Sequence, residues 1–157
     1  MPASSGRISS LVVAFLIVTL GAVAPALASE QDEAATKARM KLLDSGTKTI
    51  DVTKYPTDQK AAYRMFVAKC SKCHTIARPI NSDFVLPAQW ERYIKRMMFK
   101  PNSKMSDADG KTIYRFLVYD ASVRKRDQLK KALASLSAER EEAITKIKSI
   151  NPAFTAP

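Results

Sequence analysis

The chain has 157 residues, 46% of them hydrophobic, and its 26 basic and 15 acidic side chains give a formal net charge of +11. It contains two cysteines and one histidine, too few for a structural zinc site with four cysteine and histidine ligands. A positive charge of this size suits an acidic partner or an anionic membrane surface. The sequence carries no nucleic-acid-binding motif, so we expect no nucleic-acid partner.

Residues 1–28 have the pattern of a secretory signal peptide. Arg7 precedes an apolar run over residues 11–23, and Ala26-Leu27-Ala28 matches the A-x-A cleavage pattern. An uncleaved membrane anchor is the alternative, because the apolar stretch approaches the roughly 18 residues expected of a transmembrane helix. Cleavage after Ala28 would leave one periplasmic domain of 129 residues with a net charge of +10.

Two helices are predicted before the first cysteine. Residues 30–44 begin with acidic side chains and end with basic ones, which suits the helix dipole, and Gly46 would stop this helix. Residues 29–56 therefore form an N-terminal helical extension that ends in a loop. Thr57 is the predicted N-cap of the second helix, over residues 58–69, whose apolar positions recur at spacings of three and four.

The second helix leads into Cys70-Ser71-Lys72-Cys73-His74, which contains both cysteines and the only histidine. C-x-x-C-H is the spacing of covalent attachment of a c-type haem. The two thiols add to the two vinyl groups of one porphyrin, and the histidine binds the iron as proximal ligand. A thioredoxin-like dithiol is the rival interpretation. Export favours haem, because bacteria attach haem c on the outer side of the cytoplasmic membrane.

The segment after the haem motif is predicted to be irregular up to residue 86. Pro87 then lies near the start of a helix that extends to about Met98 and is broken by Pro101-Asn102-Ser103. Ser106-Asp107-Ala108-Asp109 resembles a capping box, with a serine followed three residues later by an acid, and predicts the start of the last core helix.

Beyond Asp120 the chain is strongly charged and keeps a helical pattern to its end. Its apolar positions, Leu129, Leu133 and Leu136, form one narrow stripe that must be buried. We expect this stripe to fold back onto the helix of residues 30–44. Docking on a partner protein is the alternative.

The sixth iron ligand is approached by elimination. No second histidine exists, and methionine is the usual remaining choice in electron-transfer haems. Three of the six methionines lie in the leader, in the N-terminal helix or in the helix that precedes the haem motif. Met97, Met98 and Met105 remain as candidates, and an open or externally filled site remains as the other outcome.

Several of these segments resemble known haem domains. Ala62 and Phe66 before the haem motif, and Ile113-Tyr114-Arg115-Phe116-Leu117, resemble the class I cytochrome c pattern. Residues 90–97 (WERYIKRM), followed by Lys100-Pro101-Asn102-Ser103 and Ser106-Asp107, are similar to the monohaem domain of the reaction-centre cytochrome of green sulfur bacteria. The resemblance covers about residues 58–120.

This resemblance implies that the first and last core helices cross at a small residue and an aromatic one, with haem held between them. The Trp-to-Met signature favours Met97 as sixth ligand, whereas ordinary class I spacing favours Met98, and Met105 occupies a position that is a buried leucine in that pattern. Only 23 residues separate His74 from Met97, which leaves little room for the usual methionine-bearing loop.

Three further side chains are candidates for contact with the haem propionates. Trp90 would use its indole N–H, and Arg78 and Arg96 would supply positive charge. The alternative without a haem contact is that Trp90 is an ordinary core residue and that Arg78 and Arg96 are ordinary surface residues.

We therefore predict a small all-α, cytochrome c-like domain around one covalent haem c, bound by Cys70, Cys73, His74 and Met97. The predicted function is an exported electron carrier between redox partners with acidic docking surfaces, not an enzyme. The alternatives are a haem subunit of a larger redox complex, associated with a membrane complex, and a haem enzyme or sensor with a labile sixth ligand. The predicted parts are a signal peptide (1–28), an N-terminal helical extension (29–56), a cytochrome c domain (57–121) and a charged helical C-terminal extension (122–157).

Overall fold

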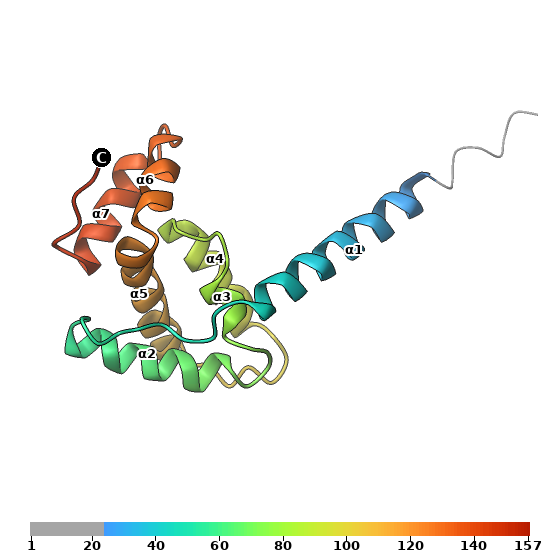
Figure 1. Cartoon of the computed structure of the whole chain (residues 1–157), viewed down its shortest axis with the longest axis horizontal. Coiled ribbons are helices and arrows are strands. Elements are labelled where there is room, and N and C mark those ends of the chain that lie inside the picture. The colour runs from blue at the N-terminus through green and yellow to red at the C-terminus, as the bar shows by residue number, and fades with distance from the viewer. Residues whose placement is uncertain (1–23) are drawn as a thin grey trace, which may run out of the picture. The chain divides into compact units, whose positions relative to one another are not determined.

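The computed structural model of the chain describes residues 24–157, with side chains from residue 31 onward. This part contains seven helices and no strand, which confirms the prediction of an all-α fold (Figure 1). The helices are α1 (Ala24–Ser45), α2 (Thr57–Cys70), α3 (Ala77–Ile80), α4 (Pro87–Met98), α5 (Asp107–Arg124), α6 (Arg126–Ala134) and α7 (Arg140–Ile150).

The predicted signal peptide lies almost entirely outside the described residues, as does the apolar run of the alternative membrane anchor. Within residues 24–157, none of the helices combines the length and the apolar character needed to cross a bilayer. The chain divides into two compact units, Met1–Arg39 and Met40–Pro157. In the first unit, the described side chains belong to α1 and are exposed.

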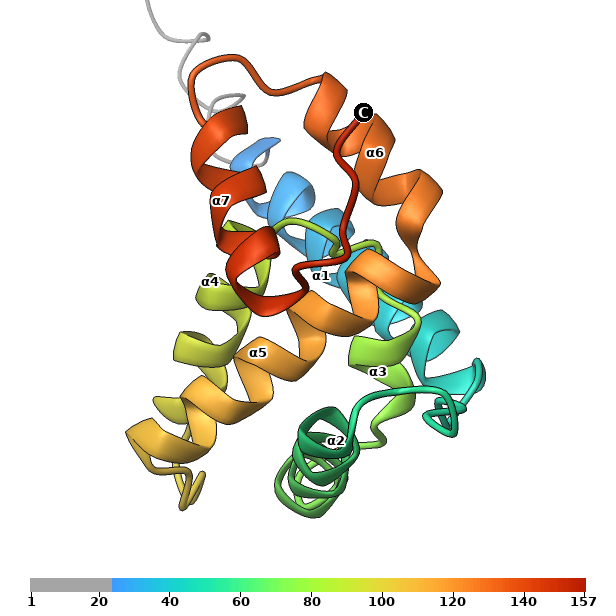
Figure 2. The same cartoon turned by 90° about the vertical axis from the view of Figure 1, so that its left-hand side faces the viewer.

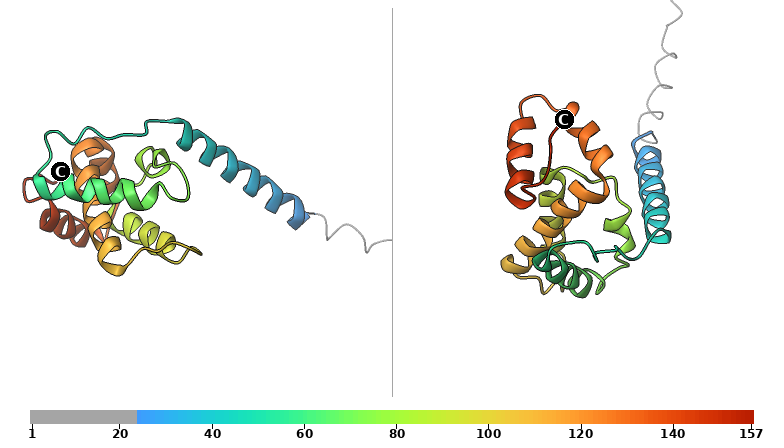
Figure 3. Two further views of the ribbon diagram at one scale, coloured as in Figure 1. Left: turned by 90° about the horizontal axis from the view of Figure 1, so that it is seen from below. Right: turned by 60° about the vertical axis from the view of Figure 1, so that its left-hand side comes forward.

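The core of the second unit is built around α5. Helix α2 lies on one side of α5, while α6 and α7 lie beside each other on the opposite side, and α4 packs along it (Figures 2 and 3). The rings of Phe66 on α2 and Phe116 on α5 lie 5.6 Å apart and are fully buried. Ala62, one turn before Phe66, is also buried. Helices α2 and α5 therefore pack against each other, with this aromatic pair between them.

The starts of α5, α4 and α2 can be compared with the helix starts predicted from the sequence. Ser106 and Asp109 form the predicted capping box: each side chain accepts a hydrogen bond from the other residue's backbone N–H, at 3.1 and 2.9 Å. Pro87 is the first residue of α4, as predicted. Thr57 is not an N-cap but the first helical residue of α2, because Pro56 before it is extended and its carbonyl accepts the first helical bond.

The end of α1 agrees with the prediction, for a different physical reason. The helix stops before Gly46, but the backbone of Gly46 is not left-handed. Instead the Asn81 side chain approaches so closely that a Cβ on Gly46 would lie 2.5 Å from Asn81 Cγ. Asn81 Nδ2 donates to the carbonyls of Leu43 and Thr47 at 3.1 and 3.0 Å, so it caps this helix end from a distant segment.

The segment after the haem motif is not wholly irregular, because it contains the four-residue helix α3. Pro79 within α3 does not prevent this, since the first-turn N–H groups of any helix lack intrahelical partners. Asn81 follows α3, and its backbone N–H donates to the Ala77 carbonyl at 2.8 Å.

The leucine stripe near the C-terminus is buried as predicted, but by other helices. Leu129 and Leu133 are fully buried, and Leu136 is half-buried. They lie in the core with α5 and α7, and the predicted helix of residues 30–44 is not needed to cover them. A break at Lys125 turns the chain between α5 and α6 and makes this packing possible.

Candidate cofactor site

The C-x-x-C-H motif lies where α2 ends. Cys70 is the last residue of the helix, and the residues up to Cys73 form turns before the bend at His74. Cys70 and His74 are half-buried, while Cys73 is exposed. The motif thus presents one thiol toward the protein and one toward solvent, with the imidazole between core and surface.

The surroundings of Cys70 suppress its reactivity as a free thiol. Burial raises the pKa of Cys70 to about 12, and the neighbouring Cys73 thiol adds to the increase. The C-terminal end of a helix is the negative end of its dipole and does not favour a thiolate. Redox-active dithiols need the opposite environment, with a lowered thiol pKa. The structure therefore disfavours the thioredoxin-like interpretation.

The imidazole of His74 is prepared for metal binding. Its Nδ1 lies 2.9 Å from the carbonyl oxygen of Thr75. A carbonyl can only accept, so Nδ1 carries the proton and donates, which leaves the lone pair of Nε2 free for a metal. Among the described residues no cluster of three or more cysteine, histidine or acidic side chains could hold an ion.

Helix α4 contributes two buried donors with no hydrogen-bond partner. Trp90 Nε1 and Tyr93 Oη are both buried and unsatisfied, and their rings meet edge to face at 5.9 Å. Each unsatisfied buried group costs roughly 1–3 kcal/mol. Burial raises the pKa of Tyr93, and the Cys70 thiol raises it further, which places this ring close to the haem motif. Acceptor oxygens supplied by a ligand would satisfy both donors.

The two arginines singled out in the sequence differ in their contacts. Arg78 on α3 makes a two-pronged ion pair with Asp44, in which Nε donates to Oδ1 at 3.1 Å. This hydrogen bond and the charge of Arg78 lower the pKa of Asp44, and Asp44 is close enough to His74 to sense the charge that the imidazole carries when protonated, so the pair lies near the motif. Arg96 lies 5.7 Å from the centre of the Tyr93 ring. Asp44 carried no signal in the sequence that pointed to this pairing.

The three candidate methionines all pack partly buried against the core. The Met98 thioether lies so close to α5 that a Cβ on Gly110 would be 2.6 Å from its sulfur. Met98 therefore has a packing role between α4 and α5. Met97 is one residue earlier, about 100° around the helix, and projects in another direction.

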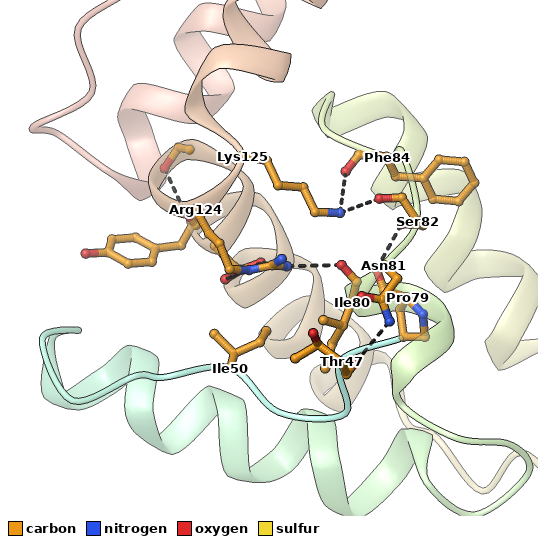
Figure 4. A network of polar contacts seen from close by, with 12 residues as sticks. Thr47, Ile50, Pro79, Ile80, Asn81, Ser82, Phe84, Arg124 and Lys125 are labelled. Atoms are coloured by element: carbon orange, nitrogen blue, oxygen red, sulfur yellow. Dashed lines mark hydrogen bonds and ion pairs between the residues drawn. The ribbon is translucent and has the colours of Figure 1, made fainter. Parts of the chain in front are cut away.

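The chain that leads into α4 is held by residues that sequence reasoning did not single out. Two cations at the end of α5 bond to carbonyls of the last residue of α3 and of the segment between α3 and α4 (Figure 4). Arg124 Nη2 donates to the carbonyl of Ile80 at 3.2 Å, and Lys125 Nζ donates to that of Ser82 at 2.5 Å. In the sequence, both belong to a basic run that resembles a solvated helix face, and nothing local marks them as buried or bonded.

No family model, no curated protein and no solved structure matches this chain. The site is therefore interpreted from its own residues.

Proposed function

We propose that the chain binds one haem c covalently and carries single electrons. Cys70 and Cys73 would form the two thioethers, and His74 would bind the iron through Nε2. The observations that carry this proposal are a C-x-x-C-H motif whose imidazole has Nδ1 committed to a carbonyl, and two unsatisfied buried donors on α4, of which Tyr93 is close enough to Cys70 for the thiol to raise its pKa.

The two donors on α4 fit the acidic groups of such a cofactor. Haem carries two propionate carboxylates, and Trp90 Nε1 and Tyr93 Oη would each donate a hydrogen bond to one of their oxygens. The positive charge of Arg96, next to the Tyr93 ring, would favour the ionised carboxylates, whereas Arg78 is already paired with Asp44. Unpaired buried donors are rare in folded proteins, so a ligand that pairs both is a physical explanation of their presence.

We propose Met97 as the sixth ligand, since Met98 is engaged with Gly110. When bound, the cofactor supplies a one-electron iron couple, and a thioether ligand favours a higher reduction potential than a second histidine. The only histidine is used at the iron, so no nucleophile and base pair that relies on histidine is left for catalysis. This supports an electron carrier in preference to an enzyme.

The remaining parts of the proposal rest on sequence features. The resemblance to class I cytochromes c, and to the haem domain of the green-sulfur-bacterial reaction-centre cytochrome, supports electron exchange with other redox proteins. The surplus of 26 basic over 15 acidic residues favours partners with acidic docking surfaces. The signal-peptide pattern supports export to the periplasm.

Haem attachment is tested by expressing the full chain in bacteria with the haem c maturation machinery. Wild type should keep its haem through acid-acetone extraction and stain for haem peroxidase activity on a denaturing gel. The Cys70→Ala and Cys73→Ala variants should each retain at most one thioether and give a low yield, and the double variant should release all haem. Release of haem from intact wild type would refute the proposal.

A further inference from the structure

Lys125 is a buried cation beside Trp90 of the candidate site. It lies at the break between α5 and α6, and only 8% of its surface is exposed. Its Nζ donates to the carbonyls of Ser82 at 2.5 Å and Phe84 at 3.4 Å. The same atom lies 5.5 Å from the centre of the Trp90 ring. Burying a charge is costly, and here two carbonyls and an aromatic face offset the cost.

These contacts connect Lys125 to both unsatisfied donors. The Phe84 ring meets Trp90 edge to face at 5.5 Å and Tyr93 at 5.9 Å. Lys125 therefore holds the backbone that carries Phe84, and also lies against Trp90 itself. Removing its ammonium would loosen the three-ring cluster from two directions.

Neighbouring charges act on the pKa of Lys125 in both directions. The adjacent Arg124 disfavours the charged form, while Asp120 on α5 and Asp83 in the segment before α4 favour it. Asp120 is itself bonded to Arg124 at 2.6 Å and to the Tyr55 hydroxyl at 2.9 Å. Burial is the largest influence and lowers the pKa of Lys125 to about 8.

We infer that Lys125 is a positioning residue of the cofactor site, whose ammonium orients Trp90 and raises the reduction potential of the bound iron. The inference rests on the proposed function. When the cofactor is bound, a positive charge buried beside Trp90 would disfavour the extra positive charge of ferric iron and so stabilise the reduced form. Loss of the proton from Lys125 removes this effect, so the potential falls as pH rises through about 8.

The test compares three variants of the full, haem-loaded chain with wild type. Lys125→Met removes the charge, Lys125→Arg keeps a charge that does not titrate, and Lys131→Met removes an exposed charge from α6 as a matched control. The midpoint potential is measured from pH 6 to 10. A second readout is the indole N–H resonance of Trp90 in the reduced protein, which is unambiguous because the chain has one tryptophan.

In wild type and Lys131→Met, the potential should fall and the indole resonance should shift over one transition near pH 8. At a fixed ambient potential, the ratio of reduced to oxidised protein should drop several-fold across that transition. Lys125→Met should show the lower potential at every pH, with no step in either readout. Lys125→Arg should keep the higher potential, again with no step, which separates the charge from general damage to the fold.

Two failures are distinguishable. Covalent haem with a potential that does not change between pH 7 and 9.5, or a step that persists in Lys125→Met, overturns the inference and leaves the proposed function standing. Haem that is lost when wild type is denatured overturns the proposed function, and the inference with it.

Discussion

Trp90 and Tyr93 show how a single unpaired atom can carry functional information. Both are aromatic residues with a polar group that normally finds a partner when buried, yet Trp90 Nε1 and Tyr93 Oη have none. Packing alone requires neither the Trp90 N–H nor the Tyr93 hydroxyl. The polar atoms cost stability unless a ligand accepts their hydrogen bonds, so their presence argues for a ligand with acceptor oxygens at this wall.

Single substitutions also distinguish Met97 from Met98 as the proposed sixth iron ligand. Met97→Ala should abolish the long-wavelength charge-transfer band of methionine-ligated ferric haem and lower the reduction potential, because water or hydroxide favours Fe(II) less than a thioether does. Met98→Ala should keep the band and lower the free energy of unfolding by about 2 kcal/mol, as expected for truncating a partly buried methionine. Absorption spectra and urea unfolding check the pair. A band lost only in Met98→Ala would make Met98 the ligand.

At the scale of elements, the site depends on how closely α4 approaches α5. Gly110 lies in the first turns of α5 and leaves room for the Met98 sulfur and for Ile94 Cγ2, which a Cβ would approach to 2.6 and 3.3 Å. A glycine in a helix costs about 1 kcal/mol relative to alanine, so its use here indicates that the close approach is worth more. Because α4 carries Trp90, Tyr93 and Met97, its distance from α5 sets where all three lie.

Gly110→Ala should therefore destabilise the protein, despite the better helix propensity of alanine. The new Cβ must displace the Met98 thioether, and overpacking of this kind costs about 1–3 kcal/mol. In a Met98→Ala background the clash with the thioether is absent, and the remaining 3.3 Å contact with Ile94 Cγ2 is relieved by a movement of a few tenths of an ångström, so the same Gly110→Ala change should stabilise by up to about 1 kcal/mol. A double-mutant cycle measured by urea unfolding checks the reversal of sign. Additive effects would show that the two residues are not coupled.

At the scale of the whole molecule, the C-terminal helices complete the fold that holds the site. Leu129, Leu133 and Ile147 are fully buried in the core that contains Phe116. Arg124 bonds to the end of α3 and Lys125 to the segment between α3 and α4, so residues beyond 121 hold the chain that leads into α4. We expect removal of residues 122–157 to expose this core and to lower the melting temperature by many degrees.

A milder change tests the same point without truncation. Leu133→Ala should lower the free energy of unfolding by about 3 kcal/mol, because it leaves a cavity among α5, α6 and α7. Leu42→Ala is the matched control, since Leu42 is 72% exposed and its truncation should cost less than about 0.5 kcal/mol. Thermal and urea unfolding of both variants give the comparison. Equal, small losses would mean that the C-terminal helices contribute little to the core.

The sequence correctly predicted those structural features that depend only on residues close together in the chain. The capping box of Ser106 and Asp109, the helix start at Pro87 and the apolar spacing around Phe66 each depend on residues within one or two turns. The C-x-x-C-H motif is local in the same sense, because its chemistry requires only the spacing of five residues. The sequence by itself therefore determined α2, α4 and the start of α5 and pointed to the candidate cofactor, whereas α3 and the break at Lys125 were not predicted.

Only the tertiary structure decided which distant residues complete the site. Asp44 pairs with Arg78 across 34 residues, and Lys125 bonds to Ser82 across 43. A lysine in a basic run and an aspartate at a helix end look the same in sequence whether they face water or protein. Their roles follow from burial and charge around them after folding, which no local pattern encodes. For the same reason, the burial of the leucine stripe was predictable from its spacing, while its partners α5 and α7 were not.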